Sequence, residues 1–170
     1  VTSTLNGVQA DDWATFLRDR LDAVGPNAHG PLAGIERGGY RLVWRETPND
    51  YSKALNTELG RVDFQYSLGL SLNASNRVTG VRWGSPAFEA GLTSGWEVVA
   101  VNGRAASAAA IAAAITASKN NSTPIQMMLK KDERFRTIDF DYHGGLRYPH
   151  LERMEGAPDR LGDILAPRRR

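Results

Sequence analysis

The clearest chemical signal in the sequence is Ser67-Leu68-Gly69-Leu70, at the start of a strand-like run. Successive backbone N–H groups around a small residue form a concavity that suits a carboxylate. The strand that follows, residues 70–73, would offer a free edge to an incoming peptide. An alanine-rich helix beside it would leave a shallow groove, because alanine fills little volume. Together these features predict capture of a peptide end by strand addition.

The predicted peptide-binding site consists of Leu68, Gly69, Leu70, Ser71, Leu72, Ala108, Ala112 and Ile115. The first three would bind the peptide through backbone N–H groups, and the next two would pair along the strand. The last three would receive the terminal side chain, which predicts a small-to-medium apolar last residue. A core-facing stripe is the alternative interpretation for Ile111 and Ile115.

Signatures of catalysis are missing from the sequence. None of His29, His143 and His150 has a second histidine four residues away, so the His-Glu-x-x-His zinc motif does not occur. The lack of cysteine excludes thiol nucleophiles, disulfides and thiolate zinc sites. There is no Gly-x-Ser-x-Gly elbow for a nucleophilic serine. We therefore expect no catalytic residue, metal ligand or cofactor within this chain.

Composition limits the classes of partner. Of the 170 residues, 41% are hydrophobic and 24% charged, a mixture that can bury a core. The net charge of +2 comes from the end of the chain, since without Arg168–Arg170 there are 18 basic and 19 acidic residues. Nucleic acid binding needs a basic face rather than a basic end, so we do not expect it. No run of about 18 apolar residues occurs, so no membrane span is expected.

Sequence patterns divide the chain into residues 1–60, 61–142 and 143–170. The first part is a helical segment, with apolar residues at helical spacing over 13–24, a short helix over 32–37 and a strand over 40–44. The second part has the pattern of a complete small domain. Its expected strands cover 62–66, 68–72, 78–83, 97–101, 125–130 and 137–142. The third part is an irregular C-terminal extension.

Two helices interrupt the expected strands of residues 61–142. Ser85 suits the N-cap of the first, with Pro86 at its first position and Gly91 at its end. Ser107 caps the second, which runs through the alanines to Lys119. The element order β-β-β-α-β-α-β-β predicts an α+β fold, a partly open β-barrel with two helices.

Three motifs in this middle part together resemble the PDZ domains of bacterial proteases. They are SLGL at 67–70, GSPAFEAGL at 84–92 and SGWEVVAVNGR at 94–104, and they occur in the order of that family. Trp96 departs from the pattern, because the family usually has an aspartate after the glycine. That aspartate is mainly a turn residue, so the change affects local turn geometry more than function.

The flanking segments resemble the glycyl aminopeptidase-type zinc metallopeptidases. The residues that carry this likeness are PLAGIERGGYRLVW at 31–44, YHGGLRYPHLERMEG at 142–156 and PDRLGDILAPR at 158–168. The resemblance implies a thermolysin-like catalytic domain followed by a PDZ domain, with residues 1–60 as the end of the former. Zinc and the catalytic residues would then lie in the missing catalytic domain.

The resemblance implies a non-catalytic, peptide-binding part of a larger zinc aminopeptidase-like protease, which assists or regulates proteolysis. Its expected partners are a peptide or protein C-terminus and the rest of its own peptidase chain. Two alternatives stay open: a structural or oligomerisation module whose groove is filled by its own chain, and a stand-alone PDZ scaffold. The absence of cysteine leaves the compartment open, and a bacterial parent would favour the periplasm or secretion over the cytoplasm.

Overall fold

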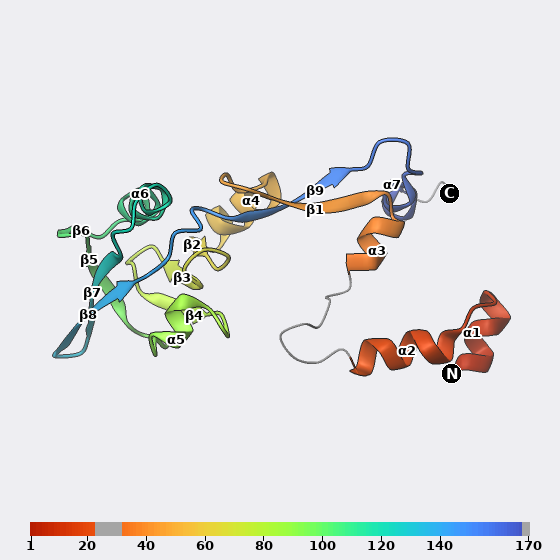
Figure 1. Cartoon of the computed structure of the whole chain (residues 1–170), viewed down its shortest axis with the longest axis horizontal. Helices are drawn as coiled ribbons and strands as arrows, with labels where there is room; N and C mark the ends of the chain where they lie inside the picture. Colours follow the sequence, from red (N-terminus) through yellow and green to blue (C-terminus); the bar gives the residue numbers. More distant parts are fainter. Residues whose placement is uncertain (23–31, 168–170) are drawn as a thin grey trace. The chain divides into compact units, whose positions relative to one another are not determined.

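The structure of the chain, a computed structural model, describes residues 1–22 and 32–167 (Figure 1). It divides into two compact units, one formed by residues 43–150 and the other by residues 1–42 with 151–170. The predicted boundaries near residues 60 and 142 stay a prediction. The last two residues of the predicted helical segment over 13–24, like His29, lie outside the described residues.

The unit of residues 43–150 contains two antiparallel sheets. The first has the order β2-β3-β4, formed by Arg61–Phe64, Leu70–Asn73 and Val78–Val81. The second has the order β6-β5-β7-β8, formed by Arg104–Ala105, Glu97–Val101, Ile125–Lys131 and Arg134–Phe140. Its helices are α4 (Asp50–Glu58), α5 (Pro86–Glu89) and α6 (Ala108–Ser118). The sheets do not close into one barrel, so the predicted α+β, PDZ-like, partly open fold is confirmed.

The predicted caps position α5 and α6. The Ser85 side chain accepts a hydrogen bond from Phe88 N–H, and the Ser107 side chain accepts one from Ala110 N–H. At the end of α5, Leu92 N–H donates to the Ala87 carbonyl at 3.0 Å, the long bond of a Schellman motif. These bonds satisfy helix-end groups that would otherwise be unpaired.

One apolar core lies between the sheets and α6. Its largest fully buried side chains are Phe64, Leu68, Leu70, Leu72, Ile111, Ile115, Ile125, Met127 and Leu129. Every member of this core belongs to the unit of residues 43–150. The alternation of buried and exposed residues along β7 follows directly from the strand period of two. Trp96, the residue that departs from the PDZ pattern, packs against this core while partly exposed.

The other unit has little buried surface. Its helices are α1 (Thr2–Val8), α2 (Trp13–Asp22), α3 (Leu32–Arg37) and α7 (Arg160–Leu165). Neither α1 nor α2 has a buried residue. Gly38 and Gly39 are buried, and their carbonyls accept hydrogen bonds from Leu161 N–H (3.2 Å) and Met154 N–H (2.8 Å). These bonds tie the end of α3 to the C-terminal segment.

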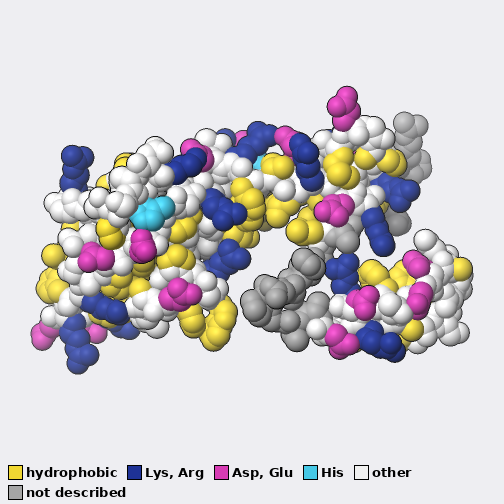
Figure 2. Space-filling view, in the orientation of Figure 1, with side chains coloured by type: hydrophobic (Ala, Val, Ile, Leu, Met, Phe, Trp, Pro, Cys, Tyr) yellow, Lys and Arg dark blue, Asp and Glu magenta, His cyan; other side chains and the backbone are white. Residues whose placement is uncertain are grey.

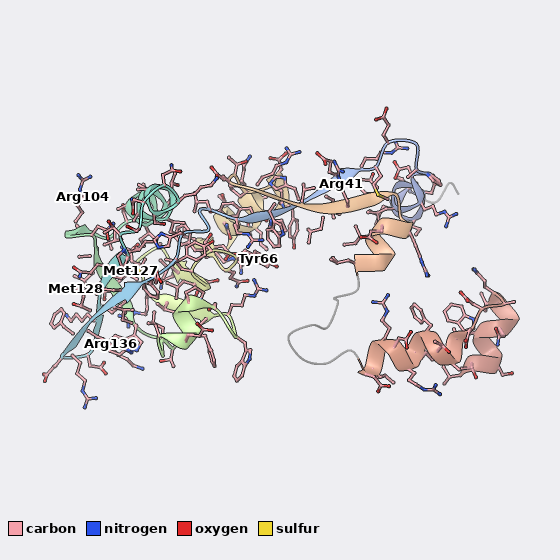
Figure 3. The ribbon with its side chains drawn as sticks, viewed as in Figure 1. Arg41, Tyr66, Arg104, Met127, Met128 and Arg136 are labelled. Atoms are coloured by element: carbon pink, nitrogen blue, oxygen red, sulfur yellow. The ribbon has the colours of Figure 1, made fainter. Side chains whose placement is uncertain are left out.

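A two-stranded sheet pairs β1 (Tyr40–Arg45) with β9 (Tyr148–Arg153). On it, Arg41 Nε donates to Glu152 at 2.8 Å (Figure 3). Such an exposed ion pair contributes little to stability, typically about 0–1 kcal/mol. None of the described helices has the length and apolar character needed to cross a membrane. Figure 2 shows basic and acidic side chains interspersed on the visible face.

Candidate functional site

The polar backbone of the SLGL loop is used inside the fold. Ser67 N–H and Gly69 N–H both donate to the Phe64 carbonyl, at 3.1 and 3.0 Å. On the other side of the loop, the Leu68 carbonyl accepts from Ala87 N–H at 2.9 Å. Gly69 N–H, one of the groups expected to bind a carboxylate, is therefore already paired within the chain.

The expected free edge at residues 70–73 is not present in the structure. Strand β3 lies between β2 and β4, and it is hydrogen-bonded to both. Along β2, Val62 stands opposite Leu72 and Phe64 stands opposite Leu70. The prediction of a free edge is wrong because the preceding strand turns back through residues 65–69 and pairs as a hairpin.

The backbone orientation of β3 shows which groups β2 covers. The carbonyls of Gly69 and Ser71 accept hydrogen bonds from Arg82 N–H (2.9 Å) and Thr79 Oγ1 (3.1 Å), so both face β4. Backbone groups of successive strand residues point to opposite sides, so those of Leu70 and Leu72 face β2. The positions at which a peptide was expected to pair are therefore occupied by the chain itself.

The helix residues of the predicted site differ in exposure. Ala108 and Ala112 are half-buried, whereas Ile115 is completely buried in the core. This burial fits the core-facing alternative for Ile115. The hollow that α6 does present, about 360 Å³, is lined instead by Val101, Asn102, Arg104, Ala110, Ala113, Ala114 and Ala117.

A second cavity borders β2, and none of its lining residues belongs to β3. We call it the outer-edge cavity, and its volume is about 250 Å³. Helix α4 and the segment 147–149 provide its walls. Its lining residues are Asn49, Tyr51, Ser52, Leu55, Asn56, Arg61, Asp63, Gln65, Tyr66, Arg147, Tyr148 and Pro149.

Hydrogen bonds fix the walls of the outer-edge cavity. Asn49 caps α4 by accepting from Ser52 N–H at 2.7 Å, and its Nδ2 donates to the Pro149 carbonyl at 2.8 Å. Asn49 thus joins the helix to the start of β9. On the strand side, Gln65 Nε2 donates to Ser71 Oγ at 2.8 Å, which holds the end of β2 against β3.

The cavity carries more positive than negative charge. Arg61 Nε donates to Asn56 Oδ1 at 3.0 Å, and Asp63 is the one acidic residue in the lining. Neither Arg61 nor Arg147 forms an ion pair with an acidic side chain in the described part of the chain. Burial, followed by the charge of Asp63, raises the pKa of Tyr148, so its hydroxyl stays protonated near neutral pH.

A stack of arginine and aromatic side chains holds one of these cations in place. The Arg147 guanidinium lies 4.6 Å from the ring centre of Trp44, which lies 4.9 Å from that of Tyr66. Arg82 covers the Tyr66 ring at 4.8 Å. Figure 3 shows Tyr66 on the loop that follows β2. Cation–π contacts of this kind contribute about 0.5–1 kcal/mol each at exposed sites.

The described histidines do not form a zinc site. Both ring nitrogens of His143 have hydrogen-bond partners, the Ser118 carbonyl and Asp141, each at 2.8 Å. The first of these bonds, followed by the second, raises the pKa of His143. His150 Nε2 is bonded to the Thr47 carbonyl. Over residues 1–22 and 32–167, no group of three or more histidine, cysteine or acidic residues could hold a metal ion.

The two antiparallel sheets, the helices and the SLGL loop define a PDZ-like protein of the α+β class. The chain shares its fold with an aminopeptidase N family protein from Idiomarina loihiensis, with a TM-score of 0.56 and 18% sequence identity over 98% of this chain. This chain spans 28% of the length of that protein. At this level of identity the likeness shows a shared fold, and it gives no support to the predicted thermolysin-like domain.

A second comparison has a lower score. The HtrA3 PDZ domain bound to a phage-derived ligand, FGRWV, has a TM-score of 0.32 and 14% sequence identity to this chain. The match covers 67% of this chain and 92% of the HtrA3 chain. No protein-family model and no curated protein matches the chain.

Sequence reasoning missed the outer-edge cavity. Helix α4 has no buried residue and only a weak apolar stripe, so its pattern is not distinctive. Its one local signal is the N-cap Asn49 followed by Asp50. Arg147 lies in a segment without periodicity, some 80 residues from the strand it faces. The sequence offers no sign that these two segments meet.

Proposed function

We propose that the chain is a non-catalytic, PDZ-like module of a larger aminopeptidase-related protein. In this module the chain's own strand β2 closes the β3 groove, the groove predicted between residues 70–73 and the alanine-rich helix. The observation that carries this proposal is the position of β3 between two strands of the same chain. The fold likeness to part of an aminopeptidase N family protein supports the link to a larger enzyme. A closed groove favours the structural alternative, in which the module supports or joins other parts of its protein.

The proposal extends to the parent protein. A glycyl aminopeptidase-type parent would hold zinc and its catalytic residues outside this chain, since the described histidines do not fit a zinc site. Peptide capture at β3 is the rival function. It would require β2 to leave Leu70 and Leu72, which would also expose the buried side chain of Phe64.

Amide hydrogen exchange measured by NMR distinguishes a closed groove from an open one. We expect the N–H groups of Leu70 and Leu72 to be protected in the free protein, because both face β2. Peptides that end in valine, leucine or alanine should leave that protection unchanged. Fast exchange at both positions, slowed by a peptide with a free carboxylate but not by its amidated form, would overturn the closed-groove proposal and restore peptide capture at β3.

A further inference from the structure

We propose that the outer-edge cavity binds the carboxyl-terminal end of an extended peptide, which pairs with the free edge of β2 and places its carboxylate at Arg61 and Arg147. None of the residues that line this site belongs to β3, so it is independent of the proposed closure of the β3 groove. The proposal depends on three properties of the cavity: its backbone edge, its unpaired positive charge and its size.

The first property is the outward-facing backbone of β2. Val62 and Phe64 face β3, so strand alternation turns the backbone N–H and C=O groups of Arg61 and Asp63 to the other side. In the part of the chain that the structure describes, no strand pairs with β2 on that side. Such an edge can add an extended peptide through main-chain hydrogen bonds.

The second property is the charge of the two arginines. Because Arg61 uses its Nε on Asn56, its terminal guanidinium nitrogens remain available to an incoming group. Arg147 is held by the Trp44 ring, so binding costs it less side-chain freedom. Two guanidinium groups at one cavity favour a carboxylate, since each can form charge-assisted, bidentate hydrogen bonds with it. The lining supplies a single acidic residue, Asp63, which leaves this positive charge in excess.

The third property is size and lining. At about 250 Å³, the cavity lies just below the range typical of ligand pockets, about 300–1,000 Å³. A chain end, with one terminal side chain, is the ligand that this volume suits. Leu55, Tyr51, Tyr148 and Pro149 offer apolar surface to that side chain. Asp63 would repel an acidic residue at the end of the peptide, so an uncharged apolar terminus is preferred.

Fluorescence polarisation with a labelled hexapeptide, Gly-Ser-Gly-Ala-Ala-Leu, tests the proposal in the full chain. We expect binding on the order of micromolar, as for other small peptide sites with ordering costs. Amidation of the peptide should weaken binding by about tenfold or more, because it removes the charge that the arginines recognise. Arg61→Ala and Arg147→Ala should each weaken it by a similar factor.

Two further variants separate recognition from folding. Arg147→Lys keeps the charge and the contact with Trp44 but loses the bidentate hydrogen bonding of the guanidinium group. It should therefore bind the peptide more tightly than Arg147→Ala and more weakly than the unmodified chain. Arg104→Ala is the matched control, because Arg104 is an exposed arginine on β6 and lines the hollow of α6 instead (Figure 3). The affinity of Arg104→Ala for the peptide should stay within about twofold of that of the unmodified chain. This change is much smaller than the one expected from the loss of a charge-assisted contact.

Chemical-shift mapping of the same peptide decides between the two sites. Shifts centred on Arg61, Asp63 and Tyr148 support the proposal. Shifts centred on Leu70 and Leu72 would overturn both this proposal and the closed-groove proposal. No binding of the free-carboxylate peptide, or equal binding of its amidated form, would overturn the outer-edge proposal alone.

Discussion

At the scale of single residues, Gly69 shows why the SLGL loop contains a glycine. Its φ is +87°, a conformation that side chains rarely adopt. A Cβ at this position would lie 1.9 Å from Ser85 Oγ and 2.1 Å from Ser85 Cβ. Ser85 cannot move away freely, because its hydroxyl donates to the Arg82 carbonyl at 2.6 Å and caps α5. The glycine therefore serves close packing between the loop and the start of α5.

We predict that Gly69→Ala destabilises the protein by about 3 kcal/mol or more, the sum of left-handed backbone strain and the clash with Ser85. Gly103→Ala is the control, since Gly103 also has a positive φ (+74°) but has no atom within 4 Å of the added Cβ. It should cost about 1–2 kcal/mol, from strain alone. Urea unfolding of both variants measures the difference. Equal losses would contradict the packing role of Gly69.

At the scale of elements, sequence patterns predicted most strands of residues 61–142 but not how these strands pair. The prediction of an irregular extension over 143–170 is wrong, because that segment contains β9 and α7, which no local periodicity marks. The runs over 62–66 and 68–72 appear as β2 and β3, and residues 97–101 form β5 as predicted. Alternation of side chains identifies a strand, whereas its partner depends on the path of the chain between strands. The five-residue connection over 65–69 allowed either a hairpin or an open groove. Because β2 pairs with β3, the connection forms a hairpin and the predicted open groove beside β3 is not formed.

The interpretation of α6 leads to a test of the core. Ile115 is fully buried, so Ile115→Ala should reduce the free energy of unfolding by about 2–5 kcal/mol. Thr116→Ala, on the exposed side of the same helix, should change it by no more than about 0.5 kcal/mol. Thermal or urea unfolding provides both values. Unchanged stability in Ile115→Ala, together with altered peptide binding, would instead support the predicted groove role of Ile115.

At the scale of the whole molecule, the core and the candidate site belong to one unit. Every buried core side chain lies within residues 43–150, as does every residue that lines the outer-edge cavity. The sequence predicted a complete small domain over 61–142, but it assigned to a peptide site several residues that the structure buries in the core: Leu68, Leu70, Leu72 and Ile115. The cavity could not be predicted in the same way. Arg61 and Arg147 line one cavity only because the chain folds, and no local sequence pattern predicts that they do so.

The contrast between the units predicts a large difference in local stability. Helices α1 and α2 have 7 and 10 residues and no buried side chain, and isolated helices of that length are marginal in water. We expect their amides to exchange at least about 100-fold faster than those of β7, whose inward side chains lie in the core. Hydrogen–deuterium exchange with mass spectrometry of the full chain measures both in one sample. The amides of α6, which is anchored by Ile111 and Ile115, are the helical control and should exchange slowly. Protection of α2 equal to that of α6 would contradict the prediction, because it would mean that helix stability here does not depend on burial.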